Sequence, residues 1–190
     1  MIYEPREDSF LLEKYVKKLV SGKVLDVGTG SGIQALAALE NTEEVLAVDI
    51  SEEVVEFCKK KNINVIQSDL FENVEGKFDW IVFNPPYLPE DDREPEDSRL
   101  ATTGGKKGDE ILKRFLVDAR KYLNEKGKIL VLISTLTGKA ENLFKDYSWK
   151  FLEKENLFME DIEVYLLQNI QKAWCYYLLD GKMWKMWRGF

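Results

Sequence analysis

Apolar and polar residues follow two different periods along this chain, and the changes between them predict an ordered series of elements. Apolar residues recur at helical spacing over residues 8–20, which predicts an amphipathic helix at the start of the chain. After it, short apolar runs bounded by glycine or polar residues alternate with further helical patterns, as expected for buried strands joined by helices. The predicted strands are 23–27, 45–50, 64–67, 78–83 and 128–134, and the predicted helices between them are 33–40, 52–61, 109–123 and 138–147.

The order of these elements predicts an α/β fold with a Rossmann-like sheet. Strands separated by helices form parallel sheets through right-handed crossovers. Two closing strands, 151–155 and 162–167, have no helix between them, so we expect them to form an antiparallel edge. The prediction is a seven-stranded, mostly parallel sheet with one antiparallel edge strand and helices on both faces. We expect one domain over residues 1–170, with the first helix leading into it.

Residues 171–190 depart from this pattern. They contain three of the five tryptophans, with lysine and arginine between them. An extra strand or hairpin, an interface patch and a disordered end all fit such an aromatic and basic tail, and its role stays open.

The composition narrows the class of protein. The chain has 190 residues, 45% of them hydrophobic, and a net charge of −7, which argues against general electrostatic capture of nucleic acid. The longest aliphatic run, 129–133, is too short to span a membrane, and the charged amino-terminal region lacks the apolar core of a signal peptide.

Cys58 and Cys175 match no metal spacing and fit reduced thiols in a cytoplasmic protein. The absence of histidine excludes histidine-based triads and histidine metal ligands, and we expect no metal site.

The candidate chemistry begins at Asn84-Pro85-Pro86-Tyr87, directly after the strand 78–83. Two prolines end the strand ladder, so Asn84 is expected at the carboxyl edge of the sheet, where open α/β sheets bind ligands. The side-chain carbonyl of Asn84 and the backbone carbonyl of Pro85 are two acceptors that suit the two hydrogens of a planar amine. The nitrogen of that amine would then face an electrophile. Tyr87 either forms a wall of the substrate slot or only packs the turn.

A glycine turn joins the first strand to the next helix. Gly28, Gly30 and Gly32 allow the backbone to turn tightly and to approach a ligand closely. Residue 33 is isoleucine where a dinucleotide fingerprint has glycine. Asp26, inside the strand end, can accept from an ammonium group, which fits a methionine moiety better than a pyrophosphate.

Two more acidic positions end the second and third strands. Asp49, followed by Ile50, can accept from both hydroxyls of a ribose, a feature that S-adenosylmethionine shares with NAD. Asp69 can accept from an adenine amino group while Leu70 covers the ring. A single aspartate at such a place is more simply a helix cap or a solvated turn. Three at successive strand ends, beside a glycine turn, favour one nucleoside site.

The segments DVGTGSG, AVDIS, QSDLF and FNPPY, in this order and spacing, resemble the class I S-adenosylmethionine-dependent methyltransferases that modify exocyclic or amide nitrogens. The opening segment 3–9 (YEPREDS) resembles the YxPxED(S/T) start of the archaeal and eukaryotic branch of HemK-type glutamine methyltransferases. The segment 104–108 (GGKKG) is similar to a Gly-Gly-basic-x-Gly segment of that branch. The resemblance covers residues 2–168 and leaves out the tail.

The resemblance implies an activity, a cofactor and two partners. The activity is N5-methylation of the glutamine in the Gly-Gly-Gln loop of a class-1 translation release factor, with S-adenosylmethionine as methyl donor. The partners are the release factor and a small zinc-binding activator subunit. The residues that would bind the cofactor are Ser9, Asp26, Gly28, Gly30, Asp49, Ile50, Asp69, Leu70 and Asn84. The residues that would bind the substrate are Asn84, Pro85, Pro86 and Tyr87, of which Asn84, Pro85 and Tyr87 are the catalytic candidates.

Other functions remain open. N6-adenine and N2-guanine methyltransferases act on similar planar amines, but they must extrude a base and hold phosphates. Six acidic residues between positions 90 and 97 disfavour nucleic-acid binding, although the basic, tryptophan-rich tail could contribute contacts to a nucleic acid. Protein lysine methylation and a cofactor-binding scaffold without catalysis are further alternatives, and the glycine spacing opposes an NAD-dependent oxidoreductase. We expect the acidic loop 88–108 either to dock basic surroundings of the target glutamine or to form a solvated lid.

Overall fold

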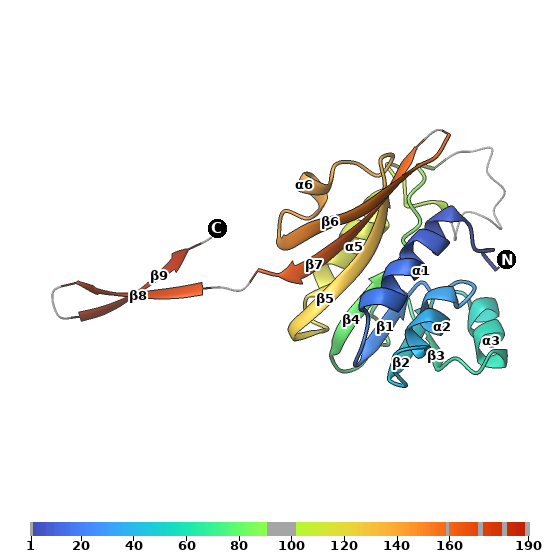
Figure 1. Cartoon of the computed structure of the whole chain (residues 1–190), viewed down its shortest axis with the longest axis horizontal. Helices are drawn as coiled ribbons and strands as arrows, with labels where there is room; N and C mark the ends of the chain where they lie inside the picture. The colour runs from blue at the N-terminus through green and yellow to red at the C-terminus, as the bar shows by residue number, and fades with distance from the viewer. Residues whose placement is uncertain (1, 91–101, 159, 171–172, 180–181, 189–190) are drawn as a thin grey trace.

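The computed structural model describes residues 2–90, 102–158 and 160–170, and the backbone alone of residues 173–179 and 182–188 (Figure 1). Its helices are α1 (Glu7–Leu19), α2 (Ile33–Leu39), α3 (Glu52–Lys60), α5 (Glu110–Ala119) and α6 (Ala140–Leu143). Its strands are β1 (Val24–Val27), β2 (Val45–Asp49), β3 (Val65–Gln67), β4 (Phe78–Phe83), β5 (Leu123–Ser134), β6 (Tyr147–Asn156), β7 (Asp161–Asn169), β8 (Ala173–Leu179) and β9 (Lys182–Arg188).

Seven of these strands form one sheet in the order β3-β2-β1-β4-β5-β7-β6. The first five pair in parallel, as expected for strands joined by helices. β7 runs antiparallel to both of its neighbours, β5 and β6. The predicted mostly parallel sheet with an antiparallel edge is therefore confirmed, and β7 lies between β5 and the outermost strand β6.

Helices cover both faces of this sheet, as predicted, because the central strands are apolar on both sides. Successive side chains of a strand point to opposite faces. On β4, Trp80 and Val82 pack into the cluster that contains α1, α2 and α3, whereas Ile81 and Phe83 pack into the cluster that contains α5 and α6. A strand buried on both faces gives a continuous apolar run instead of an alternating one.

Four elements differ from the sequence prediction by four or more residues at the far side of the sheet. Two of them are α5, which ends at Ala119 instead of residue 123, and β6, which begins at Tyr147 instead of residue 151. β5 begins at Leu123, five residues before the predicted start, because Leu123 pairs with Phe78 while the polar residues between carry no apolar signal. α6 is a single turn in place of a helix over 138–147. The chain leaves it at the fully buried Phe144, and Tyr147 then pairs with Asn169 as the first residue of β6.

The tail forms a separate two-stranded antiparallel sheet of β8 and β9, in which Trp174 lies opposite Trp187. Of the structures that fit the tail sequence, the hairpin is the one found. Throughout the described part of the chain, every helix is too short or too polar to cross a bilayer.

Candidate active site

A cavity of about 550 Å³ lies at the carboxyl ends of the parallel strands. This volume is within the range of small-molecule and cofactor pockets. All twelve of the predicted site residues line the cavity: Ser9, Asp26, Gly28, Gly30, Asp49, Ile50, Asp69, Leu70, Asn84, Pro85, Pro86 and Tyr87. The fold therefore brings together residues that are widely separated in the sequence, while their individual roles remain predictions.

The glycine turn after β1 exposes its backbone to this cavity. Gly28 and Gly30 have φ angles of 62° and 54°, in the left-handed region that favours glycine. At Gly30 glycine is required by the backbone conformation and not by lack of room, because an added Cβ atom would have no neighbour closer than 3.9 Å. The space beside Gly30 is therefore free for a ligand. Gly32 has a left-handed φ of 81° as well, and it also has no room for a side chain, since a Cβ atom there would lie 2.5 Å from the side chain of Ile63.

Asp26 ties this turn to the start of α2. Its Oδ2 accepts hydrogen bonds from the Thr29 hydroxyl at 2.6 Å and from the Ala35 backbone N–H at 3.0 Å. Burial raises the pKa of the Asp26 carboxyl to about 7, although these two bonds favour the charged form. The ammonium contact predicted for Asp26 stays a prediction.

Asp49 joins the end of β2 to the same turn. One carboxylate oxygen accepts from the Gly30 backbone N–H at 3.0 Å and the other from the Ser51 backbone N–H at 2.9 Å. Burial raises the pKa of Asp49, and these bonds oppose the shift. Each carboxylate oxygen has a second lone pair, so both can still accept from ligand hydroxyls.

Residues that follow β3 and β2 also line the cavity. Asp69 forms an ion pair with Arg114 of α5 at 2.8 Å, a partner that the sequence did not indicate. Leu70 has a φ of 51°, unusual for a residue with a side chain, and the Ser68 hydroxyl donates to its carbonyl at 3.0 Å. Ile50 is 48% exposed although it lines the cavity, so it offers apolar surface to a ligand.

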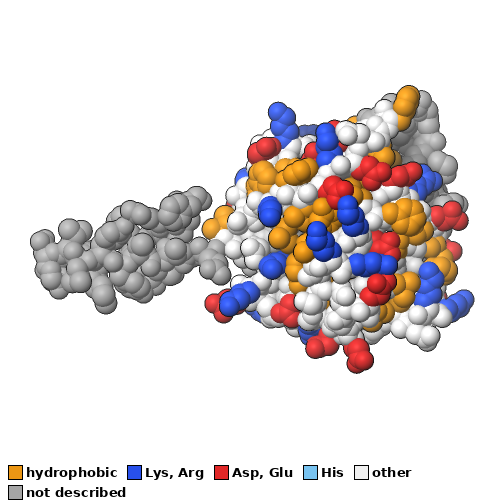
Figure 2. Space-filling model, in the orientation of Figure 1, with side chains coloured by type: hydrophobic (Ala, Val, Ile, Leu, Met, Phe, Trp, Pro, Cys, Tyr) orange, Lys and Arg blue, Asp and Glu red, His pale blue; other side chains and the backbone are white. Residues whose placement is uncertain are grey.

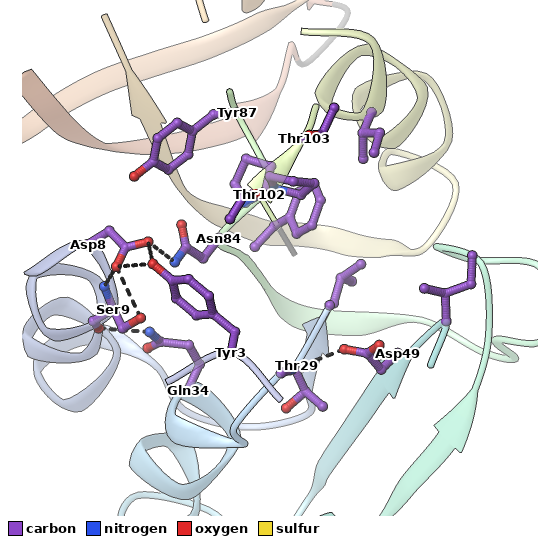
Figure 3. Close-up of a pocket in the computed structure, with 18 of the residues that line it drawn as sticks. Tyr3, Asp8, Ser9, Thr29, Gln34, Asp49, Asn84, Tyr87, Thr102 and Thr103 are labelled. Carbon is purple, nitrogen blue, oxygen red and sulfur yellow. Dashed lines mark hydrogen bonds between the residues drawn. The ribbon is translucent and has the colours of Figure 1, made fainter. Parts of the chain in front are cut away.

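Asn84 presents one buried acceptor without a partner. Its Nδ2 donates to Asp8 Oδ2 at 2.9 Å, whereas its Oδ1 is buried and has no hydrogen-bond partner among the described residues. Figure 3 shows this oxygen turned away from Asp8, towards the space beside Tyr87. Leaving a buried acceptor unpaired costs about 1–3 kcal/mol, so the position favours a ligand that supplies a donor.

Asp8 and Tyr3 are the polar residues beside Asn84 that our site prediction omitted. Asp8 is only 4% exposed, and it accepts from the Ser9 backbone N–H at 2.7 Å and from the Tyr3 hydroxyl at 3.2 Å. Burial and the neighbouring Asp8 carboxylate raise the pKa of Tyr3, which keeps its hydroxyl protonated as a donor. Both residues belong to the segment 3–9. The resemblance of this segment to a family motif was the one sequence signal that could have identified them as site residues.

The second glycine segment supports the turn that carries Asn84. The Leu88 backbone N–H donates to the Thr102 carbonyl, and the Gly104 N–H donates back to the Leu88 carbonyl, both at 2.9 Å. A Cβ atom at Gly104 would lie 2.6 Å from the carbonyl oxygen of Pro86 and would also collide with Gly108. The segment 104–108 is therefore packed against the back of the turn.

The acidic loop is only partly described. Glu90 lines the cavity. The other acids of the predicted docking surface, Asp91, Asp92, Glu94, Glu96 and Asp97, lie outside the described residues. Docking by this loop remains a prediction.

The sheet order, with β7 inserted antiparallel between β5 and β6, and the ligand cavity at the strand ends together define a class I methyltransferase fold. Comparison with protein families matches residues 7–156 to the methyltransferase small domain. The chain belongs to that family.

Two curated relatives and one solved structure extend the comparison. A putative protein N5-glutamine methyltransferase of Methanocaldococcus jannaschii is 43% identical over 153 residues, which are 76% of this chain and 78% of the relative. The release factor glutamine methyltransferase of Streptococcus pneumoniae is 35% identical over 62% of this chain, but the match spans only 47% of that protein. The E. cuniculi Mtq2–Trm112 complex, responsible for methylation of the termination factor eRF1, has a similar fold with a TM-score of 0.72 and 24% identity. That match covers 89% of this chain and 99% of the solved one.

Proposed function

We propose that this protein transfers a methyl group from S-adenosylmethionine to the side-chain nitrogen of a glutamine, in the Gly-Gly-Gln loop of a class-1 translation release factor. The observation that carries the proposal is the buried Oδ1 of Asn84, which has no hydrogen-bond partner among the described residues and belongs to a residue that lines the cavity. The names of the curated relatives support the choice of glutamine and of a release factor as substrate. Translation termination is a cytoplasmic process, so the proposed activity belongs there.

The residues of the cavity fit the proposed cofactor. The open space beside Gly30 leaves room for a ligand at the glycine turn. Asp49 would accept from the ribose hydroxyls, while Ile50 and Leu70 supply apolar surface for a purine. Ser9 and Asp26 would face the amino-acid end, and Asp69 the adenine amino group. When bound, S-adenosylmethionine supplies a methyl group already activated by a positively charged sulfur.

Asn84 and Pro85 would act on the substrate amide. A glutamine nitrogen is a weak nucleophile because its lone pair is delocalised into the carbonyl group. Asn84 Oδ1 and the Pro85 carbonyl would accept its two hydrogens, orient the nitrogen and stabilise the positive charge that develops on it. No side chain has to remove a proton before the attack, so the lack of histidine is compatible with this chemistry. The half-buried Tyr87, whose pKa is raised by burial, would form a wall of the slot.

Charge disfavours the nucleic-acid alternatives. In the described part of the chain, seven acidic and two basic residues line the cavity. On the face shown in Figure 2, lysine and arginine side chains are interspersed with aspartate and glutamate. A nucleic-acid enzyme needs a basic surface to hold phosphates around an extruded base.

Two partners complete the proposal. The protein substrate is the release factor, and the fold shared with the Mtq2–Trm112 complex supports a small activator subunit, which we expect to bind zinc.

One experiment separates the candidate functions. The protein, with and without the activator subunit, is incubated with methyl-labelled S-adenosylmethionine and one of four substrates: a release factor, its Gly-Gly-Gln variant with glutamine replaced by alanine, bulk tRNA, or DNA. We expect label only on the intact release factor, with the modified glutamine identified by mass spectrometry. Equal labelling of the alanine variant, or labelling of nucleic acid alone, would refute glutamine methylation.

A further inference from the structure

The two ends of the Asn84 side-chain amide differ in hydrogen-bonding character. The oxygen only accepts and the nitrogen only donates, so a 180° rotation of the amide would exchange the group offered to a substrate. The proposed chemistry requires an acceptor there. The two ends of the amide have nearly the same shape, so the surrounding hydrogen-bond partners decide which end faces which way. The partner of Asn84 therefore decides what the active site presents.

That partner is Asp8, whose carboxylate can only accept when it is ionised. Asp8 Oδ2 lies 2.9 Å from Asn84 Nδ2, across 76 residues of sequence. Turning the amide over would place the Asn84 oxygen against this carboxylate, with two acceptors facing each other and no hydrogen between them. Asp8 thus selects the orientation in which Asn84 Oδ1 points away from α1, towards the space beside Tyr87 (Figure 3).

Asp8 is itself held in place by neighbouring donors. Its Oδ1 accepts from the backbone N–H and the hydroxyl of Ser9 at 2.7 and 3.2 Å, and the Tyr3 hydroxyl lies 3.2 Å from Oδ2. The residue is in the first turn of α1, where the helix dipole favours a negative charge. A fixed carboxylate also polarises the amide that donates to it, which makes Asn84 Oδ1 a stronger acceptor.

We propose that Asp8 is a positioning residue for methyl transfer, which fixes the Asn84 amide so that only its oxygen faces the substrate nitrogen. The proposal rests on the proposed function. It differs from a purely structural tie between α1 and the end of β4, because it requires the direction of the Asp8–Asn84 hydrogen bond and not only its presence.

Exchanging the two side chains tests that direction. Asn84→Asp alone places two carboxylates together. Asp8→Asn alone leaves a single side-chain oxygen at position 8, which cannot accept from both the Asn84 amide and the Ser9 backbone N–H. We expect each single variant to lower turnover by about 10- to 100-fold, the range for a hydrogen bond that involves a charged group. In Asp8→Asn/Asn84→Asp the amide at position 8 donates to the carboxylate at position 84, whose other oxygen is again an acceptor for the substrate.

We therefore expect the double variant to be about 10-fold more active than Asn84→Asp alone. All variants are compared at saturating cofactor, with melting temperature and S-adenosylhomocysteine affinity measured alongside. A double variant no faster than Asn84→Asp, or an Asp8→Asn variant that retains wild-type turnover, would overturn the proposal. If the Asp8–Asn84 contact were only a structural tie, each single variant would lower the melting temperature together with turnover. The double variant would then restore both quantities or neither.

A second measurement needs no substrate. The Asn84 side-chain NH₂ group gives two proton resonances in ¹⁵N-labelled protein, identified by their loss in Asn84→Asp. We expect Asp8→Ala to move the hydrogen-bonded proton upfield, towards the position of a free amide. Tyr3→Phe, which removes only the Tyr3 bond to Asp8, is the matched control and should leave the resonance close to its original position.

The two measurements fail independently. An unchanged Asn84 resonance in Asp8→Ala would overturn the role of Asp8 whatever the substrate is. A wild-type protein that fails to methylate the release factor, but whose Asn84 resonance depends on Asp8, would refute the proposed function and leave the contact established.

Discussion

At the scale of single residues, the candidate site holds two buried polar groups that lower stability in different ways. Asn84 Oδ1 is buried without a partner among the described residues, so it has lost its water and gained no hydrogen bond. Asp26 accepts two hydrogen bonds, but burial disfavours the charged form of its carboxyl group. Both features are expected at a site that is completed by a ligand.

The first prediction concerns catalysis. Asn84→Ala removes an acceptor for the substrate amide, so we expect turnover to fall by about two orders of magnitude or more. The variant should still bind S-adenosylhomocysteine, because Asp49 and the glycine turn are unchanged. Steady-state methylation of the release factor and calorimetry measure the two quantities. Near wild-type turnover would show that the NPPY turn is not the catalytic element.

The second prediction concerns the cofactor. Asp49→Ala should weaken S-adenosylhomocysteine binding by about 1.5–3 kcal/mol, since a charged acceptor for the ribose is lost. Part of the loss would come from the glycine turn, because the Gly30 backbone N–H also loses its acceptor. Isothermal calorimetry with S-adenosylhomocysteine and with NAD is the test. Binding of NAD alone would exclude methyl transfer.

The third prediction concerns pH. The pKa of Asp26 is raised to about 7 by burial, so between about pH 4 and 7 the folded state holds a proton that the unfolded state has lost. Its contribution to the free energy of unfolding is therefore largest at low pH and is lost as pH rises through 7. Asp26→Asn keeps an acceptor for Thr29 but does not titrate. We expect urea unfolding to show the variant gaining stability over wild type from pH 5 to pH 8, by up to about 1.4 kcal/mol per pH unit. A difference that is constant across this range would contradict the prediction.

At the scale of elements, loops at the carboxyl ends of the strands are shaped by two kinds of glycine. Gly30 is required by its backbone angle and lies beside free space, whereas Gly104 has ordinary angles and no room for a side chain. The first kind leaves the cavity open for a ligand. The second kind allows the segment 104–108 to press against Pro86 and to hold the turn that carries Asn84.

The fourth prediction separates these two kinds. Gly104→Ala introduces a Cβ atom 2.6 Å from the Pro86 carbonyl oxygen, so we expect a loss of about 1–3 kcal/mol in stability and a displaced turn with lower turnover. Gly30→Ala meets no atom closely, and its cost of about 1–2 kcal/mol comes from the left-handed backbone alone. Urea unfolding and turnover are measured for both. A Gly104→Ala variant with wild-type turnover would show that the second glycine segment does not position the NPPY turn.

At the scale of the whole molecule, one cavity is assembled from the start of α1, the ends of four strands, Arg114 of α5 and the connection between β6 and β7. All of its described lining residues lie between positions 3 and 160. Along the chain, the last strand of the seven-stranded sheet is β7, which ends at Asn169. The hairpin of β8 and β9 follows it and belongs to a separate sheet.

The fifth prediction follows from this boundary. Deleting residues 171–190 should leave S-adenosylhomocysteine affinity unchanged and shift the melting temperature by no more than about 2 °C. Calorimetry and thermal unfolding check both. Loss of cofactor binding would make the tail part of the domain, and loss of release-factor methylation alone would assign the tail to substrate capture.

Local patterns in the sequence determined much of the architecture and the location of the site. Apolar runs and helical periodicity predicted the central strands, and β4 was predicted with its observed bounds. The glycine turn, the acidic strand ends and the NPPY turn identified the residues around the cavity, because parallel strands carry their carboxyl ends to one edge. Where the local signal was weak, the prediction missed strand residues. The polar start of β5 and the first four residues of β6, Tyr147–Lys150, are strand because a neighbouring strand pairs with them, whereas residues 151–155 of β6 were predicted as strand.

The tertiary structure alone decided which side chains meet across long stretches of sequence. Asp8 contacts Asn84 across 76 residues, and Arg114 pairs with Asp69 across 45. Neither contact has a local signature, because an aspartate at the start of a helix and an arginine on an exposed helix face are both common without any partner. Only the packing of α1 and α5 against opposite faces of the sheet brings these charges to its carboxyl edge, where Asp8 fixes the direction of the Asn84 amide.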